Sequence, residues 1–397
     1  MIDAPTLARI RAETPGLNGE STHLLACGSA LPAQPVLDTV IEFLQLEAMM
    51  GGYEAAAARS DQLNAVYGSV ARHINADPQD IALVENATVA WCQAFYALPM
   101  EPGQRILTCE SEYASNYLAF LQRAKRDGVK IEIVPSDASG AMDPAALDAA
   151  IGPDVAVVAV TWVPTSGGLV NPAAQIGKIT RKHGVPYLLD ACQAVGQLRV
   201  DVREIGCDFL SATGRKFLRG PRGTGFLYVT SDWASRLEPP VIDLHSASWV
   251  SRDSYTLRDG ARRFENWENA YALHAGLGAA LDYADNLGID AIEARVKALA
   301  DHARDALSAL PGVEVQDLGT ERAGIVSFTT PRESAVVARS LAQKGFILGT
   351  SSRTSTRLDF ERRDLPTLLR LAPHYYNTQD ELDACVDALA TCLKENT

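Results

Sequence analysis

One lysine stands in a glycine-rich hairpin between two apolar runs, in the segment CDFLSATGRKFLRGPRGTGFLYV (207–229). A lysine beside buried strands is costly unless its charge is used or removed. Burial and neighbouring cations lower the pKa of an ammonium group, which leaves a nucleophilic amine able to form a Schiff base. Lys216 therefore suits covalent chemistry on a carbonyl group, although a solvated hairpin tip has the same composition. Three arginines of the hairpin also predict an anion site, most simply for a phosphate: Arg215, Arg219 and Arg222.

Two further features lie where other apolar runs end. Asp190 closes the run PYLLDA (186–191), and α/β sheets bind ligands at the carboxyl ends of their strands. A carboxylate there can keep a pyridine nitrogen protonated, and pyridoxal phosphate requires this partner together with a lysine Schiff base. Asn86, Ala87 and Thr88 follow the run DIALV, where free backbone N–H groups and a hydroxyl can bind a phosphate. Each feature alone also fits a helix N-cap, but the three together predict a pyridoxal 5′-phosphate site.

The composition excludes several other classes of protein. The chain has 397 residues, of which 47% are hydrophobic and 21% charged, as in a globular protein with a substantial core. Its net charge is −13 and no basic patch offsets it, so we expect no nucleic-acid partner. The N-terminus has no apolar core of a secretory signal, and no run approaches the roughly 18 apolar residues of a membrane span. We expect a small-molecule substrate and no membrane partner.

The cysteines of the sequence indicate a reducing compartment, and the histidines argue against a metal site. The seven cysteines are scattered and form no CxxC pair, which suits reduced thiols in the cytoplasm better than disulfides. The seven histidines are dispersed and contain no HExxH pattern, so we expect no metal site.

Short apolar runs alternate with segments of helical periodicity in the first half of the chain. This alternation is typical of parallel βαβ units whose sheet is covered on both faces. The runs 207–213 and 225–229 then predict neighbouring strands with no helix between them. The preceding predicted strands are 80–86, 105–110, 130–136, 155–165 and 186–191.

The last third of the chain has a different pattern. A long helix is predicted over 267–286, followed by an amphipathic helix over 292–310. We expect a large cofactor-binding domain over 21–286 and a small α+β domain over 287–397, joined by the N-terminal segment 1–20. Further predicted elements are strands at 313–318, 324–330 and 346–351 and a terminal helix over 380–394.

These motifs resemble the class V aminotransferase family of pyridoxal-phosphate enzymes. The resemblance is to the branch of cysteine desulfurases, selenocysteine lyases and isopenicillin-N-epimerase-like proteins, and it runs from about residue 20 to the end. SATGRKFLRGPRGTGFLYV carries it most specifically, followed by LLDACQAVGQ and VPTSGGLVNP (163–172). It implies fold type I, the aspartate-aminotransferase-like α/β fold with a mostly parallel sheet in the large domain and a smaller α+β domain. It also implies a homodimer.

The resemblance implies roles for individual residues. Lys216 would carry the cofactor, Asp190 would pair with its pyridinium nitrogen, and Tyr113 would stack on its ring and move protons. Gln193 would hydrogen-bond its phenolic oxygen. Its phosphate would lie against Ala87, Thr88, Thr213 and Arg215.

Substrate contacts follow from the same comparison. Arg370, in RLAPHYYNTQDELD, would bind the substrate α-carboxylate, and Thr165 lies in the third motif. Arg353 is a second candidate for an anionic substrate group. Three further residues could approach the substrate, with no role assigned: Cys27, His245 and Trp249.

Two departures from the family pattern bear on the reaction and on the contact between subunits. Persulfide-forming desulfurases carry a nucleophilic cysteine before the carboxylate arginine, but the segment between Leu348 and Arg370 contains none. The run RRFENWE (262–268) keeps the Arg-Phe-Glu of the family but has Trp267 and Glu268 where a Gly-Thr contacts the neighbouring subunit's phosphate. The surviving Arg-Phe-Glu still implies a dimer with composite sites.

The favoured reaction is therefore β-elimination by a C–S lyase acting on a cysteine derivative. The run from Glu112 to Asn116 (EYxxN) also occurs in lyases that cleave hercynylcysteine sulfoxide, where the leaving group needs no cysteine acceptor. An amino-acid epimerase and a class V aminotransferase are the alternative enzymes. A catalytically dead ligand-binding module is the alternative of a different class.

Overall fold

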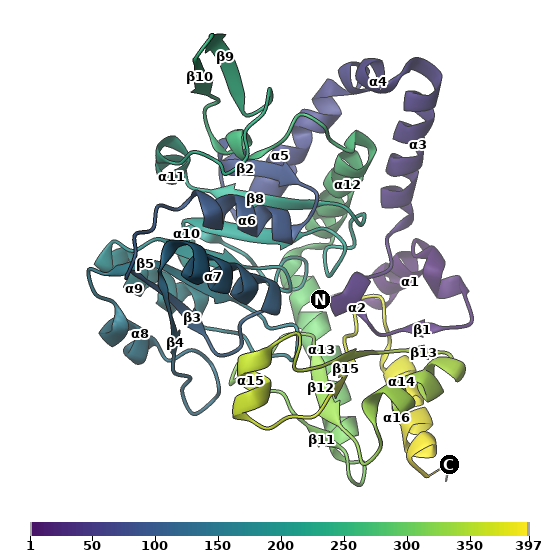
Figure 1. Ribbon diagram of the computed structural model, residues 1–397. Helices are drawn as coiled ribbons and strands as arrows, with labels where there is room; N and C mark the ends of the chain where they lie inside the picture. Colours follow the sequence, from purple (N-terminus) through teal and green to yellow (C-terminus); the bar gives the residue numbers. More distant parts are fainter. Residues whose placement is uncertain (1, 395–397) are drawn as a thin grey trace.

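A seven-stranded sheet forms the centre of the larger of two α/β units (Figure 1). The computed structural model describes residues 2–394. Strand β8 runs antiparallel to both of its neighbours, and the other pairs of the sheet are parallel, so the predicted mostly parallel sheet is confirmed. In spatial order the strands are β2 (Ile81–Val84), β8 (Gly225–Val229), β7 (Phe209–Thr213), β6 (Tyr187–Asp190), β5 (Val155–Thr161), β3 (Arg105–Cys109) and β4 (Lys130–Val134).

Helices cover both faces of this sheet because successive apolar residues of the buried strands point to opposite sides. Leu188 packs with residues of α6 (Ala87–Ala97) on one face. Its neighbour Leu189 packs on the other face, in the cluster that contains residues of α5 (Ser60–Ile74) and α9 (Ala173–His183). The continuous apolar runs of the sequence are therefore strands with no solvent-facing side.

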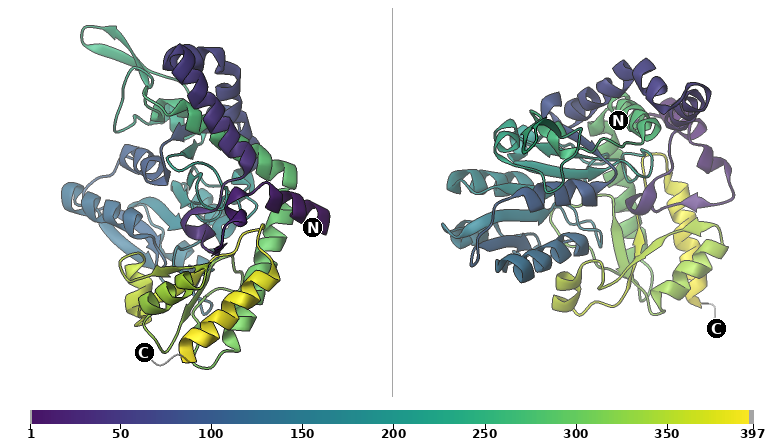
Figure 2. Two further views of the ribbon diagram at one scale, coloured as in Figure 1. Left: turned by 90° about the vertical axis from the view of Figure 1, so that its right-hand side faces the viewer. Right: turned by 45° about the horizontal axis from the view of Figure 1, so that its top comes forward.

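The smaller unit contains a four-stranded antiparallel sheet covered by helices (Figure 2). Its strands in spatial order are β11 (Glu314–Val315), β12 (Val326–Thr329), β15 (Leu368–Leu371) and β14 (Gly349–Ser351). Apolar residues of three helices form one core with this sheet. The helices are α13 (Ile289–Ser308), α14 (Ser334–Gln343) and α16 (Gln379–Lys394).

The N-terminal segment, here residues 2–31, packs against the smaller unit, although it precedes the larger unit in the chain. Strand β1 (Thr22–His23) pairs in parallel with β13 (Phe346–Ile347). Two helices, α3 (Gln34–Met50) and α4 (Gly52–Ala58), then lead away toward the upper edge of the larger unit in Figure 1. The hairpin of β9 (Ala247–Ser251) and β10 (Ser254–Leu257) projects from the same end.

The remaining elements are helices of between 3 and 17 residues. Within residues 2–394 no helix is both long and apolar enough to cross a bilayer. These elements are α1 (Ala4–Ala12), η1 (Pro15–Asn18), α2 (Ala26–Ser29), η2 (Pro78–Asp80), α7 (Ala114–Asp127), α8 (Pro144–Ala150), α10 (Val202–Ile205), α11 (Ser231–Arg236), η3 (Ala261–Phe264), α12 (Tyr271–Leu287) and α15 (Arg357–Arg362).

Two predicted elements differ from the observed ones. The helix predicted from residue 267 begins at Tyr271, because residues 265–270 form an irregular segment against the larger unit. The single strand predicted over 346–351 is two short strands, β13 and β14, which belong to different sheets. The proposed domain boundary at residue 286 falls one residue before the end of α12 at Leu287. Gly288 then leads into α13 with a positive φ of 83°.

The prediction that Arg219 belongs to an anion site is wrong. This residue has a left-handed φ of 62°, and its side chain is 1% exposed. Its guanidinium donates to Leu31 O at 2.7 Å, to Tyr375 Oη at 2.9 Å and to Thr14 Oγ1 at 2.7 Å. Each of its three nitrogens therefore donates a hydrogen bond, and these bonds fasten the hairpin after β7 to the N-terminal segment and to the smaller unit.

Replacing Arg219 should destabilise the whole molecule. Arg219→Met leaves three buried or part-buried acceptors without their donor, and we expect a loss of about 3 kcal/mol or more in the free energy of unfolding. Arg222→Met, three residues further along the hairpin and exposed, should change it by less than about 0.5 kcal/mol. Urea unfolding followed by circular dichroism measures both. Equal stabilities of the two variants would contradict the assignment.

Candidate functional site

The carboxyl ends of the parallel strands open into a cavity of about 460 Å³. Strand β6 ends there at Asp190 and β7 at Thr213, while Tyr113 precedes helix α7. This position is the usual ligand site of a parallel α/β sheet. The cavity is lined by Asn86, Ala87, Thr88, Val89, Tyr113, Asn116, Asp190, Cys192, Thr213, Arg215 and Lys216. Seven residues predicted to contact a cofactor are thus brought together.

Asp190 and Lys216 are the charged pair at the centre of the cavity. Both are buried, with 6% and 9% of their surface exposed. Burial raises the pKa of the Asp190 carboxyl, whereas the donors at Asn116 and Cys192 and the charge of Lys216 lower it. Asn116 Nδ2 donates to Asp190 Oδ2 at 2.9 Å, and the Cys192 backbone N–H donates to Oδ1 at 2.9 Å. The carboxyl group is therefore fixed in orientation by one donor on each oxygen.

Cys192 lines the cavity, a position that was not predicted for it. Its place two residues after Asp190, in LLDACQ, was the available signal. Burial raises the pKa of its thiol, although the nearby Lys216 opposes that shift. A thiol with a raised pKa is a poor nucleophile.

A phosphate cradle is formed where α6 begins. Asn86 caps this helix, its Oδ1 accepting from the Val89 backbone N–H at 3.0 Å. The N–H groups of Ala87 and Thr88 are then the first donors at the positive end of an 11-residue helix, which favours an anion. Gly225 allows strand β8 to approach the start of α6 closely, because a Cβ at this position would lie 2.8 Å from the Asn86 carbonyl carbon.

The end of β7 and the hairpin that follows it contribute two further side chains to the cavity. The Thr213 hydroxyl donates to Thr224 O at 3.2 Å, across the antiparallel pair of β7 and β8. The Arg215 guanidinium donates to the carbonyl of Gly28 in α2. The N-terminal segment therefore reaches the edge of the cavity.

Three of the predicted residues do not line this cavity but are connected to one another through Thr165. Arg370 Nη1, from strand β15 of the smaller unit, donates to Thr165 O and to Thr165 Oγ1, each at 2.7 Å. Gln193 Nε2 lies 3.4 Å from the same Thr165 Oγ1 and 3.2 Å from Cys27 O. Two buried atoms, Gln193 Oε1 and Arg370 Nε, have no hydrogen-bond partner within residues 2–394. They are an acceptor and a donor that a bound ligand could satisfy.

Arg353 is not brought into this group. It lies exposed on the turn between β14 and α15, and it does not line the cavity. Trp249 lies on β9 of the projecting hairpin, His245 lies two residues before that strand, and neither lines the cavity.

A buried carboxyl group supports the cavity from behind. Glu112 is 2% exposed and accepts hydrogen bonds from Thr108 Oγ1 at 2.9 Å, the Thr161 N–H at 3.1 Å and Asn116 Nδ2 at 2.8 Å. Burial raises the pKa of Glu112 to about 7, against the lowering effect of hydrogen bonds from Thr161, Asn116 and the Tyr113 backbone. Because Asn116 Nδ2 also donates to Asp190, the i, i+4 pair of Glu112 and Asn116 positions the Asp190 carboxyl group. The EYxxN run is visible in the sequence, but this positioning role was not predicted from it.

The residues present fit pyridoxal phosphate. Lys216 can carry an aldehyde carbon, and Asp190 is the buried carboxylate that a pyridinium nitrogen needs. The N-terminus of α6 offers N–H donors to the phosphate, and the unpartnered Gln193 Oε1 can accept a hydrogen bond. No group of three His, Cys, Asp or Glu side chains in the described part of the chain could hold a metal ion.

Removing Asn116 should weaken cofactor binding through Asp190. Asn116→Ala deletes the donor to Asp190 Oδ2, and loss of a hydrogen bond to a charged group costs about 1.5–3 kcal/mol. We expect the dissociation constant for pyridoxal phosphate to rise about tenfold or more, measured by absorbance titration of apoprotein. Gln122→Ala, on the exposed part of the same helix, should leave it unchanged. An unchanged constant in Asn116→Ala would exclude the positioning role.

Comparison with known proteins places these features in a wider group. The family model described as Aminotransferase class-V matches residues 22–385. A cysteine desulfurase of Serratia proteamaculans is 30% identical over 397 aligned residues, covering 96% of this chain and 97% of that protein. A probable cysteine desulfurase of Methanothermobacter thermautotrophicus is 28% identical, with 96% of each chain covered.

Solved structures share the fold. An apo cysteine desulfurase from Thermococcus onnurineus superposes with a TM-score of 0.91 at 24% identity, covering 98% of both chains. The cystine C-S lyase C-DES, in complex with cysteine persulfide, superposes with a TM-score of 0.86 at 24% identity, covering 95% of this chain and 99% of that one. The chain therefore shares its overall fold with these solved structures.

Proposed function

The chain belongs to the class-V aminotransferase family, and from that premise we propose that it is a pyridoxal 5′-phosphate-dependent C–S lyase acting on a cysteine derivative. The observation that carries the proposal is the buried pair of Lys216 and Asp190 in one cavity, in a chain whose segment between Leu348 and Arg370 contains no cysteine. The relatives named cysteine desulfurase support a sulfur-containing amino acid as the substrate class.

The proposed roles follow from where each group lies. When bound, pyridoxal phosphate supplies an electron sink for a carbanion at the substrate α-carbon. Lys216 Nζ would hold the cofactor and then take the α-proton from the substrate. Asp190 would keep its carboxylate against the pyridine nitrogen, because Asn116 and the Cys192 N–H fix both of its oxygens. The backbone N–H groups of Ala87 and Thr88 would bind the phosphate.

Substrate binding is assigned to the residues beside the cavity. Arg370 would pair with the substrate α-carboxylate, since its Nε has no partner within residues 2–394 and its Nη1 already points at Thr165. A guanidinium suits a carboxylate because it can donate two parallel hydrogen bonds. Tyr113, the residue that precedes α7 and lines the cavity, would stack on the cofactor and move a proton at its hydroxyl.

The sulfur would leave with its own substituent. Elimination breaks the bond between Cβ and sulfur and releases a thiol or a sulfenate, and the remaining enamine takes up water to give pyruvate and ammonium. Transfer of sulfur to the protein would need an accessible thiolate. Cys192 is in the cavity, but its raised thiol pKa opposes that role.

We also propose that the protein acts as a homodimer in the cytoplasm. Its seven cysteines are all free, as in a reducing compartment. Five large apolar side chains are exposed along α3 and α4, a concentration that is unusual for a monomer surface. They are Ile41, Leu44, Met49, Met50 and Tyr53, with Met49 86% exposed.

A product assay tests the reaction. Purified protein should show the visible absorbance of a lysine Schiff base with the cofactor, and Lys216→Ala should abolish it. Cysteine, S-substituted cysteines and their sulfoxides are then supplied, and pyruvate and ammonia are assayed. We expect equal amounts of both products from at least one S-substituted compound, and Lys216→Ala should form them at least about a thousandfold more slowly. Racemised substrate without pyruvate would exclude the lyase.

Charges placed on the exposed apolar helices should separate the dimer. Leu44→Glu with Met49→Glu removes apolar contacts worth about 1.5–3 kcal/mol each, so we expect the dissociation constant of the dimer to rise by about a hundredfold or more. Size-exclusion chromatography with light scattering measures the mass. Leu121→Glu, which charges an equally exposed leucine on α7, is the control and should remain dimeric. A monomeric unmodified protein would refute the proposal.

A further inference from the structure

Glu112 is bonded to two groups that would lie against the cofactor ring. Its Oε1 accepts from the Tyr113 backbone N–H at 2.8 Å and from Asn116 Nδ2 at 2.8 Å. Tyr113 lines the cavity, and Asn116 Nδ2 also donates to Asp190 Oδ2 at 2.9 Å. One carboxyl group therefore anchors both the ring proposed to stack on the cofactor and the carboxylate proposed to face its pyridine nitrogen.

The hydrogen bonds around Glu112 favour its charged form. Its Oε2 accepts from Thr108 Oγ1 at 2.9 Å and from the Thr161 backbone N–H at 3.1 Å, and its Oε1 also accepts from the Thr161 hydroxyl. An amide nitrogen has two protons. Asn116 gives one of them to Glu112 and the other to Asp190. Donors on both oxygens stabilise a carboxylate more than a protonated carboxyl group.

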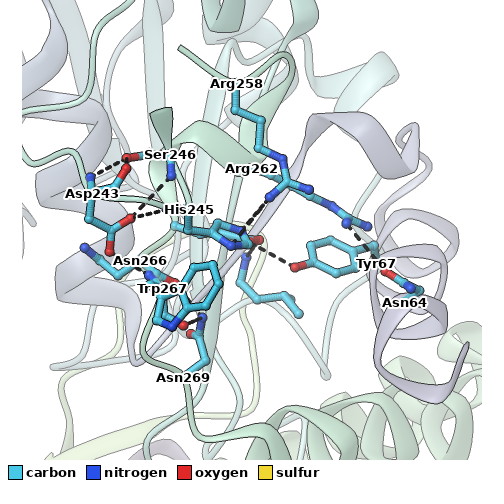
Figure 3. Close-up of polar contacts among 12 residues, drawn as sticks. Asn64, Tyr67, Asp243, His245, Ser246, Arg258, Arg262, Asn266, Trp267 and Asn269 are labelled. Atoms are coloured by element: carbon cyan, nitrogen blue, oxygen red, sulfur yellow. Dashed lines mark hydrogen bonds and ion pairs between the residues drawn. The ribbon is translucent and has the colours of Figure 1, made fainter. Parts of the chain in front are cut away.

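The charge of Glu112 is not compensated by a neighbouring cation. Glu112 and Glu265 are both 2% exposed. Glu265 contacts the His245 ring at 2.8 Å, and Arg258 and Arg262 line the same pocket as that ring (Figure 3). Within residues 2–394 no lysine, arginine or histidine forms an ion pair with Glu112. A buried carboxylate without a cation is costly, so its hydrogen bonds alone must offset its loss of hydration.

These opposing effects allow Glu112 to change its charge near neutral pH. Burial, together with the charge of Asp190, raises the pKa of Glu112 to about 7, against its hydrogen bonds. The other titratable group that faces it is Cys109 at the end of β3, whose Sγ lies 3.9 Å from Glu112 Oε2. Burial and Glu112 hold the pKa of this thiol well above its ordinary value, so it stays neutral. Glu112 is therefore charged above about pH 7 and neutral below it.

An ionised Glu112 adds a second negative charge behind the cofactor. It joins Asp190, on which the buried Lys216 acts. A cofactor with a protonated pyridine nitrogen would bring a positive charge to these two carboxylates. We propose that Glu112 is a positioning residue whose negative charge, linked to Asp190 through Asn116, strengthens binding of the protonated cofactor. This inference rests on the roles proposed above for Asp190 and Tyr113.

The test compares cofactor binding at two pH values. Glu112→Gln keeps nearly the shape of the protonated carboxyl group but cannot become charged. Cofactor-loaded protein is dialysed to equilibrium against graded concentrations of pyridoxal phosphate, and the bound cofactor is read by visible absorbance. At about pH 8 we expect the dissociation constant to be about tenfold higher in Glu112→Gln than in the unmodified protein. At about pH 6, where both side chains are neutral, the two constants should be about equal.

Two further variants control this comparison. Glu110→Gln removes a carboxylate two residues earlier that pairs with Arg362 at 3.1 Å and does not line the cavity. It should bind the cofactor as the unmodified protein does at both pH values. Thr108→Val removes one donor from Glu112 Oε2 and leaves the carboxyl group in place. It should move the midpoint of the pH dependence upward, because the charged form loses a hydrogen bond.

Each outcome supports or overturns the inference. Weaker binding by Glu112→Gln at about pH 8 only would support it. A difference of equal size at both pH values would show a purely structural role, and no difference at either would show no role; both would overturn it. Should Glu112→Gln fail to fold by circular dichroism, an unmoved midpoint in Thr108→Val would overturn it. Absence of cofactor binding by the unmodified protein would overturn the proposed function as well.

Discussion

The burial of two opposite charges at one edge of a parallel sheet is the constraint on which the rest of the structure depends. A carboxylate removed from water is costly unless it is paired and hydrogen-bonded. Asp190 meets that condition through Asn116, the Cys192 N–H and the charge of Lys216. These groups come from three separate connections, and only parallel strands with aligned carboxyl ends bring them to one place.

The hairpin after β7 both places Lys216 in the cavity and binds the N-terminal segment and the smaller unit. Lys216 points into the cavity, and Arg219, three residues on, turns the opposite way through a left-handed backbone to bind Thr14, Leu31 and Tyr375. The N-terminal segment and the smaller unit are thus fastened to the same hairpin that carries the lysine. Arg370 reaches Thr165 from the smaller unit, so both units contribute to the proposed substrate side.

Much of the larger unit could be predicted because its strands are buried on both faces and read as continuous apolar runs. The residues at their ends could be located for the same reason. Prediction failed where tertiary contacts decide. The direction of Arg219 depends on three distant acceptors, the split of 346–351 depends on pairing with β1, and the link from Glu112 through Asn116 to Asp190 joins separate strands. No local pattern encodes these contacts.

The fate of sulfur follows from where thiols are buried. Accepting sulfur needs a thiolate that can reach the substrate, and a thiolate needs water or a nearby cation to be stable. Cys109 ends β3 and Cys207 precedes β7, both in the core of the larger unit, while Cys385 and Cys392 lie in the core around α16. Burial raises the pKa of Cys109, Cys207 and Cys385. Cys192 is the thiol that lines the cavity beside a cation, and its pKa is still raised because desolvation outweighs Lys216. A reaction in which the sulfur departs with the leaving group requires none of these thiols. Such a reaction therefore fits this chain better than transfer of the sulfur to a protein cysteine to form a persulfide.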